Sequence, residues 1–259
     1  MDPHEAIALT ATMRTESGLF FDFDGTLAAI RSDPGAVELP EDTKSSLAGI
    51  AGRVKRIGIV SARPVVFLSS KLGSLPGIRL YGVYGLETLD ASGELVRHPS
   101  VERWEPAIAE AARRASVELP KEIRLENKRL TLGLHFRDAP ELRPLVEDWA
   151  RTYAEKTSLR LQQGRMVVEL VPPLDYDKGD IVAREIQDLR CAWYFGDDIS
   201  DMEAFGALDQ QEDARPGFFG IKVAVCNPET GDKVREMADF SLDSPDDLSD
   251  FLDQLSHEL

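Results

Sequence analysis

GLFFDFDGT (residues 18–26) is the stretch that decides the fold. A short apolar run ends in two aspartates and a glycine, a pattern typical of a buried strand followed by a sharp turn. Asp22 and Asp24 are two residues apart, so both carboxylates leave the same side of the strand. Ligands of open α/β sheets bind outside the carboxyl ends of the strands, and both acids fall there. A turn that only closes a strand would use the same residues.

Apolar strands alternate with helical segments on both sides of this stretch. We expect further strands at 54–61, 78–85, 191–198 and 220–226, and helices at 41–52, 179–189, 200–208 and after Ser244. This alternation predicts an α/β fold with a doubly wound parallel sheet. From about 100 to 174 the order becomes helix, strand pair, helix, strand pair, which predicts an inserted α+β cap. The expected core is therefore 1–99 and 175–259, and the cap is 100–174.

Charge and apolar content narrow the class of protein. The 259 residues include 30 basic and 46 acidic ones, for a net charge of −16. An acidic surface repels phosphate backbones and anionic lipids, which argues against binding to nucleic acid or membranes. No stretch reaches the ~20 apolar residues of a membrane span, and the N-terminus lacks the features of a secretory signal. We therefore expect a cytoplasmic monomer. Cys191 and Cys226 favour two buried thiols, with a disulfide left open.

A second acidic strand end supports a functional interpretation of the first. Asp197 and Asp198 follow an apolar strand, and Asp201 lies one helical turn further on. Helix capping would use the same residues. Carboxylates gathered in one crevice repel each other unless a cation neutralises them, and their hard oxygens suit Mg²⁺. Ser61 ends another strand and Lys178 precedes a helix, so a hydroxyl donor and a cation complete a phosphoryl site.

These motifs resemble a known superfamily. DFDGT, a strand-end serine, an isolated lysine and GDDISD follow one another in the order seen in haloacid dehalogenase-like phosphatases. The resemblance implies a haloacid dehalogenase-like core in which Asp22 is the nucleophile that forms an aspartyl phosphate. It implies that Asp24 is the general acid, which later activates water. Ser61 and Lys178 would hold the transferring oxygens.

The same resemblance implies the metal site and the reaction. Mg²⁺ would be bound by Asp22, the main-chain carbonyl of Asp24 and Asp197, with Asp198 and Asp201 behind them. Dehalogenases of the superfamily lack the second aspartate, and the transport ATPases need membrane spans. Hydrolysis of a phosphate monoester is the favoured reaction.

A narrower resemblance concerns the substrate. DFDGTLAAI, VSARP, YGVYGLE, ENKRLTLGLHFR, QQGRMVVELVPP and GDDISDMEAF are similar, in this order, to the motifs of trehalose-6-phosphate phosphatases. The resemblance implies a phosphorylated sugar as substrate, trehalose 6-phosphate first, and a role in trehalose biosynthesis. It also implies that the sugar hydroxyls are bound by cap residues, namely Glu126, Lys128, His135, Arg137, Arg165 and Glu169. A solvated strand face with cross-strand ion pairs would show the same alternation.

Departures from the family pattern keep two alternatives open. Tyr84 stands in place of histidine, Arg165 in place of lysine and Val171 in place of arginine, with smaller changes at Ala62, Met202 and Glu203. Arginine does not replace lysine where a point donor is needed. One alternative is a phosphatase for another phosphorylated sugar. The other is a catalytically weak regulatory module that binds a sugar phosphate.

Overall fold

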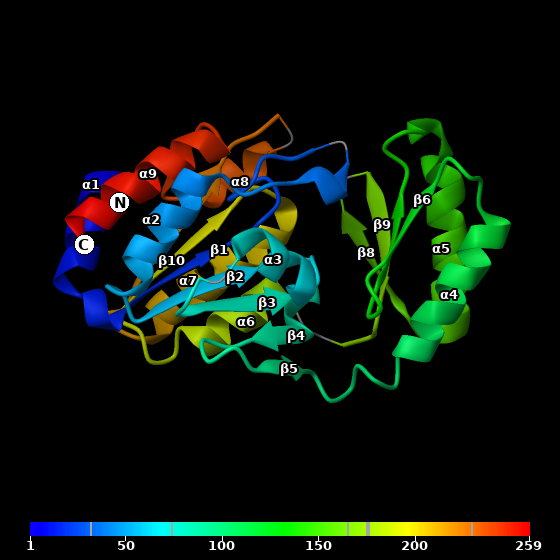
Figure 1. The fold of residues 1–259 in the computed structure, drawn as a ribbon, viewed down its shortest axis with the longest axis horizontal. Helices are drawn as coiled ribbons and strands as arrows, with labels where there is room; N and C mark the ends of the chain where they lie inside the picture. Colours follow the sequence, from blue (N-terminus) through cyan, green and yellow to red (C-terminus); the bar gives the residue numbers. More distant parts are fainter. Residues whose placement is uncertain (32, 74, 165, 175–176, 229) are drawn as a thin grey trace. The chain divides into compact units, whose positions relative to one another are not determined.

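The computed structural model describes residues 1–31, 33–73, 75–164, 166–174, 177–228 and 230–259. The chain divides into two compact units (Figure 1). The larger unit comprises Met1–Val96 and Tyr176–Leu259, and the smaller comprises Arg97–Asp175.

A mostly parallel sheet forms the centre of the larger unit. Its order among the described residues is β12-β11-β10-β1-β2-β3-β4-β5. The strands from β12 to β3 are parallel, and β4 is antiparallel to β3. All five residues of β1 are buried, because helices cover both faces of the sheet. The bounds are β1 Ser17–Phe21, β2 Arg56–Val60, β3 Ile78–Gly82, β4 Glu87–Leu89, β5 Leu95–Arg97, β10 Cys191–Gly196, β11 Phe219–Val225 and β12 Phe240–Leu242.

Two apolar clusters hold these helices on the sheet. Leu19 and Phe21 of β1 belong to the cluster with α1 (Pro3–Thr12), α2 (Glu41–Ala51), α3 (Val65–Leu72) and α9 (Pro245–Glu258). Phe20 points to the opposite face, into the cluster with α6 (Lys178–Glu185), α7 (Met202–Ala214) and α8 (Asp232–Met237). The alternation along β1 therefore confirms the predicted doubly wound sheet. The short 3-10 helices are η1 Arg14–Glu16, η2 Pro34–Ala36, η3 Val83–Gly85, η4 Pro140–Leu142 and η5 Ile199–Asp201.

The structure differs from the predicted elements at several places. The strand predicted at 78–85 ends at Gly82, since Val83 and Tyr84 take positive φ angles of 48° and 56°. Helices α1 and α3 were not predicted, and α3 opens with Val65 and Val66, residues typical of strands. Helix α6 begins at Lys178 rather than after it, because Asp177 is its N-cap.

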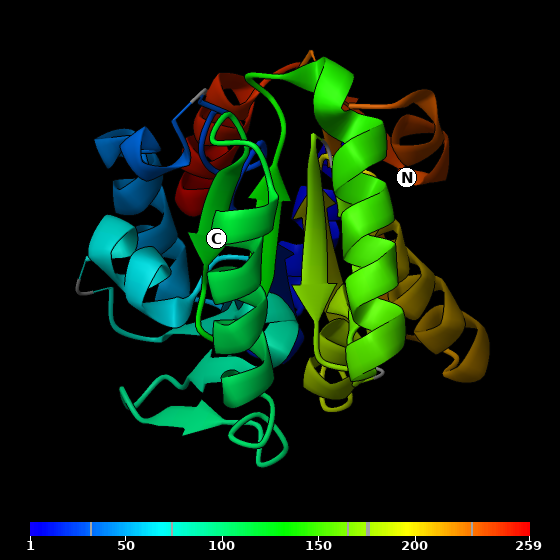
Figure 2. The same cartoon turned by 90° about the vertical axis from the view of Figure 1, so that its right-hand side faces the viewer.

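The smaller unit is a four-stranded antiparallel sheet with two helices on one face. The strand order is β6-β7-β9-β8. Helices α4 (Glu105–Glu118) and α5 (Arg143–Thr157) lie on the same side of this sheet, as Figure 2 shows, around an apolar core that includes Leu132, Leu134 and Val168. The element order is the predicted one. The bounds are β6 Arg124–Asn127, β7 Leu132–His135, β8 Arg160–Gly164 and β9 Val167–Val171.

The structure also bears on the two cysteines and on membrane-spanning helices. Cys191 and Cys226 are both free and buried, which confirms the favoured interpretation of two thiols. Within the described part of the chain, no helix is both long and apolar enough to cross a membrane.

Candidate active site

Three neighbouring strands bring the predicted catalytic residues to one edge of the large sheet. Phe21 of β1 pairs with Phe195 of β10 on one side and with Ile59 of β2 on the other. The residues that follow, Asp22 and Ser61 among them, therefore emerge together at the carboxyl edge. The Asp22 main chain also donates a hydrogen bond of 2.9 Å to the Phe195 carbonyl, which extends the pairing to the aspartate itself.

A buried acidic cluster forms at this edge. Asp22, Asp197 and Asp201 each present a carboxylate oxygen, and these oxygens lie within 4.8 Å of one another. Lys178 Nζ lies 3.0 Å from Asp22 Oδ1 and 2.7 Å from Asp201 Oδ1. One ammonium facing three carboxylates leaves a charge of −2 when all are ionised. Such a surplus is costly in a buried site unless a further cation neutralises it.

The surplus of negative charge in this cluster also appears in the pKa values of its carboxyl groups. Burial raises the pKa of the Asp22 carboxyl well above its usual value, and Lys178 opposes that shift. Burial, followed by repulsion from Asp201, raises the pKa of Asp197 to about 8. Lys178 is raised in pKa as well, because the attraction of Asp201 and Asp22 outweighs the cost of burying its charge. A bound divalent cation would favour the ionised form of these carboxyls.

Asp201 is fully engaged by protein donors. Its Oδ1 accepts from Lys178 at 2.7 Å and from the hydroxyl of Tyr194 at 2.7 Å. Its Oδ2 accepts from the main-chain N–H groups of Asp197 and Asp198 at 3.0 and 3.1 Å. Asp201 therefore orients Lys178 and the loop after β10. Asp201 was singled out from the sequence, whereas Tyr194 was not.

Asp197 is held by two side chains that the sequence did not single out. Thr26 donates to its Oδ1 at 3.0 Å, and Asn227, which follows β11, donates to its Oδ2 at 2.8 Å. Gly25 has a φ of 93°, and a Cβ atom there would clash with the Asp197 carboxylate. These donors fix the carboxylate while leaving lone pairs for a metal, the arrangement that outer-shell partners give to metal ligands.

The donor set fits a hard divalent cation. The carboxylate oxygens of Asp22, Asp197 and Asp201 are the ligand type that such cations prefer. Sulfur does not contribute to the cluster, which argues for a hard rather than a soft metal.

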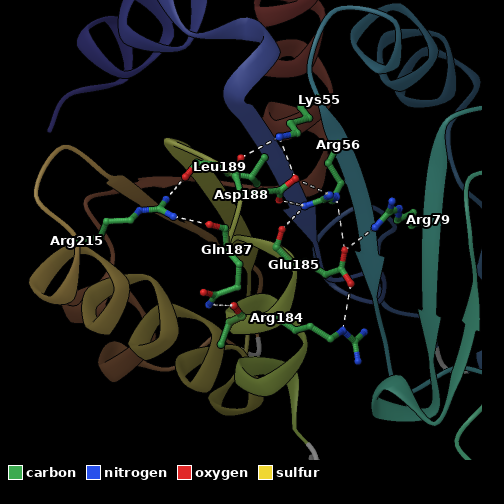
Figure 3. A network of polar contacts seen from close by, with 10 residues as sticks. Lys55, Arg56, Arg79, Arg184, Glu185, Gln187, Asp188, Leu189 and Arg215 are labelled. Atoms are coloured by element: carbon green, nitrogen blue, oxygen red, sulfur yellow. Dashed lines mark hydrogen bonds and ion pairs between the residues drawn. The ribbon is translucent and has the colours of Figure 1, made fainter.

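Lys178 is the first residue of α6, and polar contacts hold both ends of this helix. At the N-terminus Asp177 and Asp180 form a reciprocal capping box, with bonds of 3.0 and 3.1 Å. At the C-terminus Glu185 binds the guanidinium of Arg79 at 2.7 Å. Figure 3 shows this end, where basic side chains also donate to carbonyls just beyond the helix. Arg56 donates to the main-chain carbonyl of Glu185 itself, and such a contact satisfies a last carbonyl of the helix.

Asp24 pairs with an arginine that was not predicted. Arg63 donates from Nε to Asp24 Oδ2 at 2.7 Å and from Nη2 to Asp24 Oδ1 at 2.8 Å. The main-chain N–H of Arg63 donates to Ser61 Oγ at 3.1 Å, which fixes the buried serine. The only sequence signal for Arg63 was its place in VSARP, two residues after Ser61.

In the described part of the smaller unit, Glu126, Lys128, His135 and Glu169 belong to one network. His135 Nε2 lies 2.8 Å from Glu126 Oε2. Lys128 Nζ lies 3.0 Å from Glu169 Oε1 and 3.8 Å from Glu126 Oε2. The side chains of Lys128 and Glu169 are only 7% and 5% exposed, which is not typical of a solvated face.

The register explains why these residues meet. Gly133 of β7 pairs with Glu126 on β6 and with Glu169 on β9, so all three positions share the face opposite the helices. Thr131 donates a further hydrogen bond to Glu169. Arg137 follows β7 and is half-buried, and Arg165 lies outside the described residues.

Comparisons with known proteins agree with these motifs. A family model described as trehalose-phosphatase matches residues 20–246. The trehalose-phosphate phosphatase of Mycobacterium avium is 32% identical over 252 residues, which cover 93% of this chain and 62% of that protein. The chain thus spans less than two thirds of the curated relatives it matches.

Solved structures share the fold at lower identity. The C-terminal domain of a C. albicans trehalose-6-phosphate phosphatase matches with a TM-score of 0.81 at 21% identity, covering 99% of this chain and 97% of that one. The C-terminal domain of a Candida albicans trehalose synthase regulatory protein gives 0.70 at 14%, covering 96% and 97%. A haloacid dehalogenase-like hydrolase from Bacteroides thetaiotaomicron gives 0.61 at 19%, covering 93% and 100%, which agrees with the predicted fold.

Proposed function

Because the chain belongs to the trehalose-phosphatase family, we propose that it hydrolyses a sugar phosphate monoester, with trehalose 6-phosphate as substrate and trehalose and phosphate as products. The observation that carries this proposal is the buried cluster at the carboxyl edge, where Lys178 lies 3.0 Å from Asp22. A nucleophilic carboxylate beside a fixed ammonium suits transfer of a phosphoryl group.

The proposed reaction has two steps. An Asp22 oxygen forms a bond to phosphorus as the bond from phosphorus to the sugar oxygen breaks, and Asp24 gives its proton to that oxygen. Water then attacks phosphorus, Asp24 takes up the water proton, and the bond to Asp22 breaks to release phosphate. Lys178 and Ser61 hold the phosphoryl oxygens in both steps.

We propose Mg²⁺ as the metal. Asp22, Asp197 and the main-chain carbonyl of Asp24 would hold it, and it would neutralise part of the phosphoryl charge when bound. Thr26 and Asn227, which donate to Asp197, would keep that ligand oriented.

The smaller unit is proposed to select the substrate. Its network of Glu126, Lys128, His135 and Glu169 offers charged donors and acceptors suited to sugar hydroxyls. Arg137 and Arg165 complete the proposed set. Tyr84, Arg165 and Val171 depart from the family pattern, so a different phosphorylated sugar is the second candidate substrate.

A regulatory module that only binds a sugar phosphate is the competing class. A protein described as regulatory shares the fold, so the fold does not separate the two classes. The retained set of Asp22, Asp24 and Lys178 favours the enzyme, because binding alone needs neither a nucleophile nor a general acid.

The test is phosphate release with Mg²⁺ across a panel of phosphorylated sugars, with Asp22→Ala as the blank. We expect the wild type to prefer trehalose 6-phosphate. Preference for another sugar would retain the chemistry and replace the substrate. Binding without release across the whole panel would contradict the enzyme and support the regulatory module.

A further inference from the structure

Asp24 and Arg63 form a two-point ion pair in which each carboxylate oxygen has its own donor. The Nε–H group bonds Oδ2 at 2.7 Å and an Nη2–H group bonds Oδ1 at 2.8 Å. The side chain of Arg63 is 10% exposed and that of Asp24 is 30% exposed. A two-point contact of this kind fixes the plane of a carboxylate as well as its position, which a single ammonium cannot do.

The guanidinium of Arg63 is itself held by an aromatic ring. Its central carbon lies 4.5 Å from the centroid of the Phe67 ring. Phe67 packs edge-on against Phe23, with centroids 6.1 Å apart and planes at 90°. Phe23 lies between the two catalytic aspartates in the sequence, so the ring that supports Arg63 also rests on the strand end that carries them.

The backbone that carries Arg63 is anchored by the segment after β3. The N–H of Val83 donates to the Arg63 carbonyl at 2.9 Å, and the N–H of Tyr84 donates to the Ser61 carbonyl at 3.0 Å. Both donors have positive φ angles, an uncommon backbone state for non-glycine residues and a rare one for a β-branched valine. A strained backbone persists only where the surroundings determine it, and here those surroundings are the 61–63 loop.

Gly82, at the end of β3, and Glu87, at the start of β4, also contact the loop that carries Arg63. A Cβ atom on Gly82 would lie 2.8 Å from the Arg63 carbonyl and 2.6 Å from the Val65 nitrogen, closer than such atoms approach. Buried Glu87 accepts the N–H of Val65 at 3.1 Å. The YGVYGLE segment thus acts as a support for the loop that presents Ser61 and Arg63.

From this geometry we propose that Arg63 is a positioning residue that aims the Asp24 carboxylate at the leaving oxygen of the substrate. The inference rests on the proposed function, because it assigns Arg63 a part in that reaction. The two bonds occupy one lone pair on each oxygen, and the exposed part of the carboxylate keeps others for proton transfer. A general acid must lie within hydrogen-bond reach of its target. Without Arg63 the Asp24 carboxyl would lose its orientation, and protonation of the leaving group would therefore become less efficient.

The test compares two leaving groups. An alkoxide needs a proton as it leaves, whereas a nitrophenolate does not. Steady-state kcat and KM are measured for the sugar phosphate that the wild type prefers and for para-nitrophenyl phosphate, in Arg63→Ala, Asp24→Asn and the double variant. We expect Arg63→Ala to lower kcat for the sugar ester at least about tenfold more than kcat for the aryl ester. The double variant is expected to be no slower than Asp24→Asn alone.

Arg56 provides the matched control. Its side chain is 12% exposed and pairs with Glu185, whose side chain is 10% exposed, at the opposite edge of the same sheet. Arg56→Ala removes a similarly buried arginine, and we expect the ratio of the two kcat values to stay at the wild-type level. Arg63→Lys keeps a positive charge but cannot form both bonds, so it is expected to shift the ratio in the same direction as Arg63→Ala by a smaller factor.

The outcomes separate this inference from the proposed function. Equal losses for both esters in Arg63→Ala and Arg63→Lys would show a structural role and overturn the inference while the function stands. Losses that multiply in the double variant would also overturn it, because Arg63 would then act independently of Asp24. A wild type that hydrolyses neither ester would overturn the proposed function and the inference together.

Discussion

The two edges of the large sheet carry similar charged groups in opposite proportions. At the carboxyl edge, Asp22, Asp197 and Asp201 surround the single ammonium of Lys178. At the amino edge, shown in Figure 3, Arg56, Arg79 and Arg184 surround Glu185. Helix α6 joins the edges, with Lys178 at its first residue and Glu185 at its last.

The difference lies in how each surplus of charge is compensated. At the amino edge helix and loop carbonyls accept the extra donors, as where Lys55 binds the Asp188 carbonyl at 2.9 Å, and Arg184 stays 46% exposed to water. At the carboxyl edge the surplus is negative, and the carboxylates of Asp22 and Asp197 are buried. Carbonyls and water therefore compensate much of the surplus at the amino edge, whereas the buried surplus at the carboxyl edge calls for a cation.

The largest expected effect contrasts Asp22→Asn with Glu185→Gln. Loss of the nucleophile should lower kcat by at least about 10⁴-fold, as for the nucleophiles of other covalent enzymes. Glu185→Gln should lower kcat only slightly, because it weakens ion pairs with Arg56 and Arg79 at the amino edge and leaves the carboxyl edge unchanged. Phosphate release by both variants under saturating substrate is the measurement. Comparable losses would mean that the two edges are not functionally distinct.

The next effect concerns the donors to Asp197. Asn227→Ala and Thr26→Val each remove one hydrogen bond to that carboxylate. We expect each to weaken Mg²⁺ binding about 10- to 100-fold, the usual cost of losing an outer-shell partner. Isothermal titration with Mg²⁺ gives the Kd, and Thr43→Val, which breaks a hydrogen bond to Ser249 away from this edge, is the control. Unchanged Kd values for Asn227→Ala and Thr26→Val would remove Asp197 from the metal site.

A smaller effect follows from the raised pKa of Asp197. This pKa is about 8 in the metal-free protein, against about 3.9 in an unfolded chain. Between these values the folded state holds a proton that the unfolded state has released, so the stability of the metal-free protein falls as the pH rises. Mg²⁺ bound at Asp197 would displace that proton, so we expect its binding to strengthen as the pH rises.

Melting temperatures with Mg²⁺ and with a chelator test this linkage. The gain in Tm on adding Mg²⁺ should be larger at about pH 8 than at about pH 6. In Asp197→Asn the gain should become small at both values. A gain in Tm that is greater at the lower pH would contradict the assignment of Asp197 as a metal ligand with a raised pKa.

The smallest expected effect on activity is that of Arg56→Met. It leaves the buried Glu185 with Arg79 and Arg184 as remaining partners, so we expect a loss of about 1 kcal/mol in the free energy of unfolding. We expect a lower denaturation midpoint in urea with kcat nearly unchanged. A large loss of kcat at full stability would show that the amino edge takes part in the reaction.

The sequence predicted the residues whose signal is local. Asp22 and Asp197 stand directly after apolar strands, with Asp24 two residues beyond Asp22, and such strand ends can be recognised without a structure. Tyr194 could not be identified, because its neighbours in CAWYFG are equally apolar and only the packing turns its hydroxyl to Asp201. Asn227 lies in a loop far along the chain, and parallel pairing of β11 with β10 brings it to Asp197.

The predicted elements failed where tertiary contacts override local preference. Val83 and Tyr84 continue the apolar pattern of β3, yet bonds to the Ser61 and Arg63 carbonyls hold them in a left-handed turn. Val65 and Val66 favour a strand, yet they open α3, where buried Glu87 accepts the Val65 N–H. Both failures border the candidate active site, where function constrains the backbone most strongly.

The central claim is that Asp22 carries the phosphoryl group during turnover. Rapid mixing of the wild type with Mg²⁺ and trehalose 6-phosphate, followed by acid quenching and peptide mass spectrometry, tests it directly. We predict one phosphoryl group on the peptide that contains Asp22, formed within the first turnover and missing from Asp22→Asn. Rapid phosphate release without any labelled peptide, or a label on another residue, would contradict the account.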